Sequence, residues 1–200
     1  EIFSLIAEEL GLAGEKYNGF CRHPLSFLVE AADDICYQIM DVEDAHKLKI
    51  LDFDETCDIL LAFYDKETEP DFFKMQESVF SEVSDQNERI AFLRAMIINK
   101  LAEEATGVFL NNYEKIMNGS FQKSLLENLT GTAGKAMENC IKISIDKIYR
   151  HHSVVQIELA GYNILGTLLE EFTGAVCNPG MHYSKLLLSL IPEQFKVKSN

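Results

Sequence analysis

The sequence predicts an all-α protein. Leu, Glu, Lys and Ala are frequent, and Pro occurs only at positions 24, 70, 179 and 192, so helix formers dominate and helix breakers are few. Apolar residues recur at spacings of three and four, whereas the alternation typical of strands is hard to find. With 200 residues, 47% of them hydrophobic, the chain can bury one substantial core. We expect a single all-helical region over residues 1–200, organised as a multi-helix bundle.

The first predicted helices lead into a long amphipathic one. A short helix is expected over residues 2–12, where Gly residues supply the stop signal. Pro24 suits the first turn of a helix, because its missing N–H needs no partner there, and the helix that it opens is expected to end near residues 47–49. His23 precedes that Pro, and it is either a residue of the helix entry or a ligand.

The later helices follow from the same apolar spacing. They are expected over residues 55–64, 80–101, 105–117, a short segment within 121–126, then 133–149, 153–172 and 181–191. Asp54 or Thr56 would cap the first of these. Ser153 and Gln156 form a capping-box pattern, and the helix that they open carries an apolar face with Gly161 allowing close helix approach. The charged connector at 65–70 is expected to be a mobile surface loop.

The charge of the chain limits its partners. A net charge of -14 argues against nonspecific binding to nucleic acid or to an anionic membrane, which needs a cationic surface. Arg89, Arg94 and Lys100 lie in the predicted helix 80–101. They either face a phosphate group or belong to a solvated helix surface.

The cysteines and the hydropathy pattern indicate a cytoplasmic protein. The five Cys, at positions 21, 36, 57, 140 and 177, are odd in number and lack CxxC spacing, so we expect free thiols in a reducing compartment. The sequence shows no signal peptide and no transmembrane run.

The helix from His23 to Asp44 has two distinct faces at about 100° per residue. One is a broad apolar face, expected to be core, that contains Leu25, Leu28, Val29, Ala31, Ala32, Ile35, Cys36, Ile39, Met40 and Val42. The other is acidic, and on it Tyr37 lies four residues from both Asp33 and Asp41. These three side chains would form a row about 12 Å long, able to hold a metal at one end and a hydroxylated ligand along the rest. The alternative is an acidic stripe that faces solvent.

The run CRHPLSFLVEAADDICYQIMDVEDAHKL resembles the deoxyguanosine triphosphate triphosphohydrolases, a branch of the HD-domain phosphohydrolases. The resemblance implies an HD-domain-like helical bundle. It also implies that Asp33 is the last of four metal ligands, that Tyr37 packs on the nucleotide and that Asp41 binds the 3′-hydroxyl of the sugar.

A second stretch, QIELAGYNILGTLLEEF, is similar to the same family. The resemblance implies that Glu158 reads the base in guanine-selective members. A carboxylate suits this task because guanine offers two adjacent donors, N1–H and the exocyclic amine. The alternative is an exposed helix Glu.

The resemblance implies metal-dependent hydrolysis of dGTP to deoxyguanosine and inorganic triphosphate. The cofactor would be a divalent metal, Mg or Mn, whose bound water attacks the α-phosphorus, and the protein would be a homo-oligomer. Two alternatives stay open, namely a broad-range dNTP triphosphohydrolase of the same superfamily and a non-catalytic helical interaction or regulatory module.

The HD signature itself is absent from this chain. None of the His residues, at 23, 46, 151, 152 and 182, is followed by Asp, so the resemblance covers the later portion of a catalytic domain. Residues 1–65 would carry the metal and substrate helix, and 71–200 the helical remainder. No catalytic acid or base is assigned, and we expect the missing ligands to lie before Glu1. Alone, this chain would be inactive, whether it is a fragment or begins at Glu1.

Overall fold

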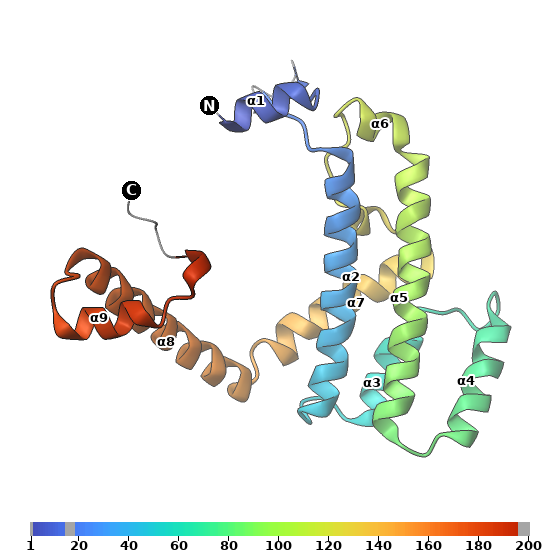
Figure 1. The fold of residues 1–200 in the computed structure, drawn as a ribbon. Helices are drawn as coiled ribbons and strands as arrows, with labels where there is room; N and C mark the ends of the chain where they lie inside the picture. The colour runs from blue at the N-terminus through green and yellow to red at the C-terminus, as the bar shows by residue number, and fades with distance from the viewer. Residues whose placement is uncertain (1, 15–18, 196–200) are drawn as a thin grey trace. The chain divides into compact units, whose positions relative to one another are not determined.

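The computed structural model describes residues 2–14 and 19–195. The chain divides into two compact units, Glu1–Tyr149 and Arg150–Asn200, and each is described by itself. Helices make up most of both units (Figure 1). Over the described residues the strands are limited to β1 (Ala13–Gly14) and β2 (Gly19–Phe20), which pair antiparallel. The predicted all-α class is therefore confirmed. The expectation of one single region remains a prediction.

The first unit contains seven of the labelled α-helices and two irregular helical turns. They are α1 (Ile2–Glu9), α2 (Pro24–Lys47), α3 (Phe53–Leu61), α4 (Pro70–Glu82), α5 (Gln86–Asn111), α6 (Tyr113–Met117), the 3-10 turn η1 (Leu126–Asn128), α7 (Gly131–Ile143) and the π-helical turn η2 (Ser144–Ile148).

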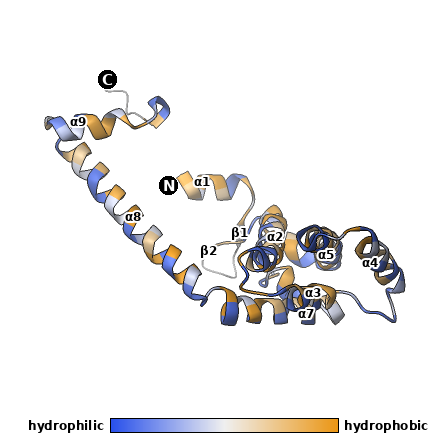
Figure 2. Cartoon of the chain, turned by 90° about the horizontal axis from the view of Figure 1, so that it is seen from below, coloured by the Kyte–Doolittle hydropathy of each residue, from blue (hydrophilic) through white to orange (hydrophobic). Residues whose placement is uncertain are grey.

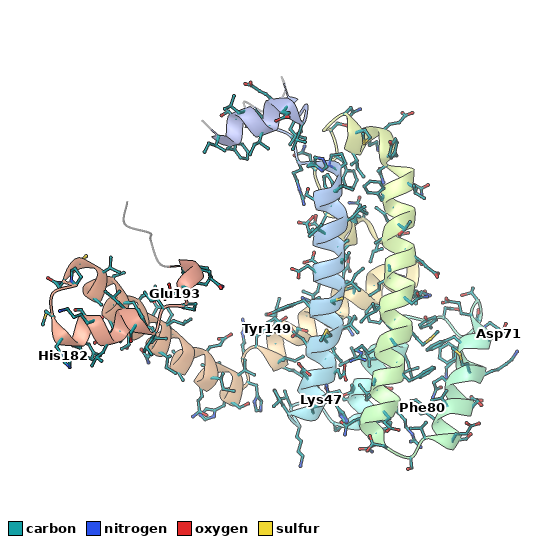
Figure 3. The ribbon with its side chains drawn as sticks, viewed as in Figure 1. Lys47, Asp71, Phe80, Tyr149, His182 and Glu193 are labelled. Carbon is teal, nitrogen blue, oxygen red and sulfur yellow. The ribbon has the colours of Figure 1, made fainter. Side chains whose placement is uncertain are left out.

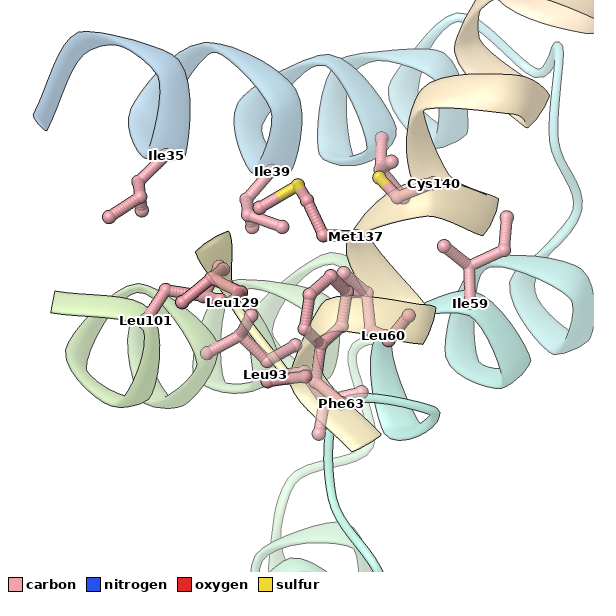
Figure 4. Close-up of a cluster of buried hydrophobic side chains, with 14 of the residues drawn as sticks. Ile35, Ile39, Ile59, Leu60, Phe63, Leu93, Leu101, Leu129, Met137 and Cys140 are labelled. Atoms are coloured by element: carbon pink, nitrogen blue, oxygen red, sulfur yellow. The ribbon is translucent and has the colours of Figure 1, made fainter. Parts of the chain in front are cut away.

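The core of this unit lies between α2 and α5, which run antiparallel side by side, with α3 and α7 packed against them (Figure 1). Figure 4 shows where side chains from these elements meet, among them Ile39 of α2, Leu93 of α5 and Met137 of α7. Burial of such side chains supplies the main stabilising free energy of the unit, at roughly 1.5–3 kcal/mol for each large apolar side chain.

Only part of the apolar face predicted for α2 belongs to the core. Of its residues Ala31, Ile35, Ile39 and Val42 are buried, together with Phe27 and Ala45, which were not assigned to that face. The remaining apolar residues are exposed, namely Leu25, Leu28, Val29, Ala32, Cys36 and Met40. The expectation of one broad core face was wrong for these positions, because the neighbouring helices of the unit pack against only one side of α2.

The helix starts show which entry residues act as caps. His23 is the N-cap of α2, and its Nδ1 accepts a hydrogen bond of 3.2 Å from the Leu25 amide, so the helix-entry alternative is correct. Asp52 caps α3 by accepting from the Glu55 amide at 2.8 Å. The prediction of Asp54 or Thr56 was wrong, since both lie inside the first turn of that helix.

The predicted helix 80–101 is in fact divided between two helices. Helix α4 ends at Glu82, and α5 starts at Gln86 with Asp85 as its N-cap. This cap accepts from the Glu88 amide at 2.9 Å, so the polar segment before Gln86 begins a new helix instead of continuing the old one.

Three cations of α5 have structural partners. Arg89 donates to the carbonyl oxygens of Phe80 and Val83 at the end of α4. Arg94 pairs at 2.6 Å with Glu43 of α2, and Lys100 pairs with Glu69. Neither sequence-based alternative describes them, because their charges tie α5 to neighbouring elements.

The second unit consists of α8 (His152–Cys177), α9 (His182–Ser189) and the 3-10 turn η3 (Glu193–Phe195). Figure 2 shows apolar residues along α8, and the predicted buried face was wrong, because Ile157 is 69% and Leu165 62% exposed. Among the residues that the structure describes, no atom from another part of the chain lies within 4 Å of the position that a Cβ of residue 161 would occupy, so no described helix approaches Gly161 closely.

The start of α8 also differs from the prediction. Its N-cap is His151, whose side chain accepts from the Ser153 amide. The capping box at Ser153 was therefore wrong, since that residue lies within the first turn.

All five cysteines are free thiols, as predicted. Burial raises the pKa of Cys57 to about 11 and that of Cys140 to about 12, so these two stay protonated and unreactive at neutral pH. Over residues 2–14 and 19–195, the structure contains no helix whose length and apolar character would let it cross a membrane.

Candidate active site on helix α2

The three predicted residues Asp33, Tyr37 and Asp41 follow one another at successive turns of α2. Ile35 and Ile39, on the other side of the helix, are fixed in the core. Asp33 is exposed, Tyr37 is 59% exposed and Asp41 is half-buried. The row therefore lies on a rigid helix and becomes more enclosed towards Asp41.

The Asp41 carboxylate has a partner from a distant part of the chain. The hydroxyl of Tyr149 donates a hydrogen bond to its Oδ2 at 2.6 Å. Burial raises the pKa of Asp41, the hydrogen bond from Tyr149 lowers it, and the charge of Asp44 raises it. The Asp41 carboxylate is thus oriented by a hydrogen bond to one of its oxygens, Oδ2. Its second oxygen, Oδ1, is of a type that can accept from another donor.

A neighbouring stripe of α2, made by Glu30, Asp34 and Gln38, lines a hollow of about 640 Å³. Helix α7 and the segment around η1 form its other walls, and Arg22 and Lys123 bring positive charge to it. Burial raises the pKa of Asp34, and the nearby Glu30 and Asp33 carboxylates raise it further. Asp33, Tyr37 and Asp41 do not line this hollow.

Asp33 stands without a set of metal-binding neighbours. Over the described residues no group of three or more His, Cys, Asp or Glu side chains could hold a metal ion. A divalent cation needs several oxygen or nitrogen ligands. The described part of the chain therefore does not fit a complete divalent-metal site.

Glu158, the predicted base-reading residue, lies in α8 of the second unit, where its side chain is exposed. The structure thus brings Asp33, Tyr37 and Asp41 together on one helix, whereas Glu158 belongs to the unit described separately.

Sequence reasoning missed Tyr149. It lies 108 positions after Asp41, at the end of η2 (Figure 3). No spacing rule links two residues so far apart in the sequence. The π-helical turn that precedes Tyr149 has no recognisable sequence motif. The available signal was only an aromatic residue with a polar end at the close of an apolar helix.

Fold and site together define an all-helical protein with a carboxylate–tyrosine–carboxylate row on a long core helix. The chain is 32% identical over 200 residues to a deoxyguanosinetriphosphate triphosphohydrolase-like protein of Synechocystis sp., which covers 98% of this chain and 42% of that protein. It is 28% identical over 176 residues to the deoxyguanosinetriphosphate triphosphohydrolases of Yersinia enterocolitica and Yersinia pestis, with 84% of this chain and 35% of each relative covered. No family model matches the sequence.

Over nearly its whole length, the chain is thus similar to proteins named deoxyguanosinetriphosphate triphosphohydrolase. It spans less than half of the length of these curated relatives.

Proposed function

We propose that this chain is part of a deoxynucleoside triphosphate triphosphohydrolase that converts dGTP to deoxyguanosine and inorganic triphosphate. The observation that supports this most directly is the similarity to relatives named for dGTP hydrolysis, which extends over nearly the whole chain. The row on α2 supports it independently, because it offers an aromatic ring between two carboxylates.

The residues of the row would bind the nucleoside. The ring of Tyr37 would pack against the sugar and base, and its exposed position leaves room for such a contact. The free oxygen of Asp41 would accept a hydrogen bond from the 3′-hydroxyl. Tyr37 would also crowd the 2′ side of the sugar and so disfavour ribonucleotides. Glu158 would read guanine through its two adjacent donors.

Asp33 would be one ligand of a divalent metal, Mg or Mn. The family implies such a metal, but Asp33 would need partners that the described residues do not provide.

We further propose a homo-oligomer in the cytoplasm. The exposed apolar residues of α2 and α8 are surfaces that a second copy could cover. The five free thiols fit a reducing compartment.

The experiment is dGTP hydrolysis by the full-length protein with Mg²⁺ or Mn²⁺, measured as deoxyguanosine and triphosphate released. We expect Asp33→Ala to lower kcat by at least about 100-fold and to weaken Mn²⁺ binding in isothermal titration calorimetry. Asp58→Ala is the matched control, since Asp58 is an exposed aspartate on α3 of the same unit. Unchanged Mn²⁺ affinity in Asp33→Ala would remove the ligand assignment, and a wild-type protein that releases no triphosphate would refute the function.

A further inference from the structure

The Tyr149 side chain joins two elements that are distant in sequence. Its hydroxyl donates to Asp41 Oδ2 at 2.6 Å, which is the length of a charge-assisted O–H···O⁻ hydrogen bond. Such bonds are about twice as strong as neutral ones. The contact therefore restrains the Asp41 side chain to one rotamer. An exposed carboxylate on a helix would otherwise change between several rotamers.

A local departure from α-helical geometry sets the direction of Tyr149. The amide of Tyr149 donates to the carbonyl oxygen of Ser144 at 2.8 Å, five residues earlier, and residues 144–148 form the π-helical turn η2. One extra residue in a turn shifts the following side chain by about 100° around the axis. Ser144 and Ile148 are buried, so the irregular turn is anchored against α2. Turns of this kind are frequent at functional sites.

The electrostatic surroundings keep Tyr149 a hydrogen-bond donor. Burial raises the pKa of its hydroxyl, and the hydrogen bond to Asp41 and its charge raise it further, while a hydrogen bond with Gln38 opposes them. The phenol thus keeps its proton at neutral pH. The hydroxyl therefore remains the donor in its hydrogen bond to Asp41 Oδ2.

We propose that Tyr149 is a positioning residue that fixes the Asp41 carboxylate for the 3′-hydroxyl of the bound deoxynucleotide. This inference rests on the proposed function. Tyr149 acts through Asp41 and reads the sugar only indirectly. Its hydroxyl is thus a determinant of selectivity between deoxynucleotides that carry and lack the 3′-hydroxyl.

The test compares Tyr149→Phe, Asp41→Asn and the double variant in the full-length protein, with dGTP and 2′,3′-dideoxyguanosine triphosphate as substrates. Tyr149→Phe keeps the ring and removes only the hydroxyl. We expect kcat/KM for dGTP to fall about ten-fold, mainly through KM, while kcat/KM for the dideoxy substrate stays within about two-fold. The double variant should lose no more of the preference for dGTP than Asp41→Asn alone, because both changes disrupt the same pair of side chains, Tyr149 and Asp41.

Tyr113→Phe is the matched control, since Tyr113 is 50% exposed on α6 of the same unit; it should leave both substrates unaffected. A Tyr149→Phe enzyme that loses equally on both substrates, or keeps its full dGTP preference, would overturn the inference while the proposed function stands. Additive losses in the double variant would overturn it as well. If the wild-type enzyme hydrolyses neither substrate, the proposed function fails and takes this inference with it.

Discussion

Two acidic residues of α2, Glu43 and Asp34, point in different directions and have different electrostatic surroundings. Glu43 is 4% exposed and is paired with Arg94 at 2.6 Å and with Lys47 at 3.0 Å. Asp34 faces the hollow beside Glu30 and Asp33, and it has only like charges near it among the causes that shift its pKa. The negative charge of Glu43 is compensated by its two ion pairs. The negative charge of Asp34 destabilises the folded state, and this is an electrostatic cost.

This cost predicts a pH-dependent gain in stability for Asp34→Asn. The pKa of Asp34 is raised above its ordinary value of 3.8 by burial and by its acidic neighbours. The folded state therefore binds the proton more tightly than the unfolded state, and stability falls as the pH rises through the folded pKa. We expect Asp34→Asn to have a higher Tm than wild type at pH 7, with the difference shrinking as the pH is lowered towards 3.8.

Differential scanning fluorimetry across this pH range would measure the effect. Asp58→Asn, on an exposed position of α3, is the control and should show no such gain. A difference that persists undiminished at pH 4, or that is absent at pH 7, contradicts the electrostatic explanation.

At the scale of elements, the sequence predicts helices well where apolar spacing and a cap agree. The start of α2 at His23-Pro24 and the row of Asp33, Tyr37 and Asp41 along it follow from local rules. The separation of α4 from α5 was not predicted, although no apolar residue lies between Val83 and Ile90 and Asp85 supplies an N-cap there.

Features that depend on tertiary partners could not be predicted. Which residues of the apolar α2 face are buried depends on where α5 and α7 lie. The partner of Asp41 depends on the π-helical turn η2, whose geometry exists only in the packed unit. Local propensity carries no information about either.

The Asp85 cap gives a prediction for the α4–α5 junction. Asp85→Ala removes the acceptor of the Glu88 amide, and we expect a loss of about 1 kcal/mol in the free energy of unfolding. Asp85→Asn should retain most of the stability, because Asn is an equally good N-cap. Urea denaturation followed by circular dichroism measures both variants. An Ala variant as stable as the Asn variant would show that the cap does not define this helix start.

The whole molecule is strongly anionic, with a net charge of -14. A nucleoside triphosphate, the substrate that we propose, would be repelled at long range and must be met by local positive charge. Arg89, Arg94 and Lys100 are engaged within the fold. These three side chains are thus not the source of positive charge for the triphosphate, and other cationic groups or the proposed metal would have to supply it.

The base selectivity that we propose for the full-length protein can be tested at Glu158. Glutamine replaces one acceptor oxygen with an amide donor, which would oppose one of the two guanine donors. We expect Glu158→Gln to lower kcat/KM for dGTP at least about ten-fold while the values for dATP, dCTP and dTTP change little.

Glu170→Gln, at an exposed position on the same helix, serves as the control. Equal losses on all four triphosphates, or none, would favour the broad-range alternative over guanine reading.

The contact between Asp41 and Tyr149 also has a consequence for biosynthesis. Tyr149 is added 108 positions after Asp41, which takes roughly 5 to 20 s at typical elongation rates. During that interval α2 can already associate with α5, but Asp41 lacks its hydroxyl partner. The Asp41 end of the row is thus among the last parts of the first unit to mature on the nascent polypeptide.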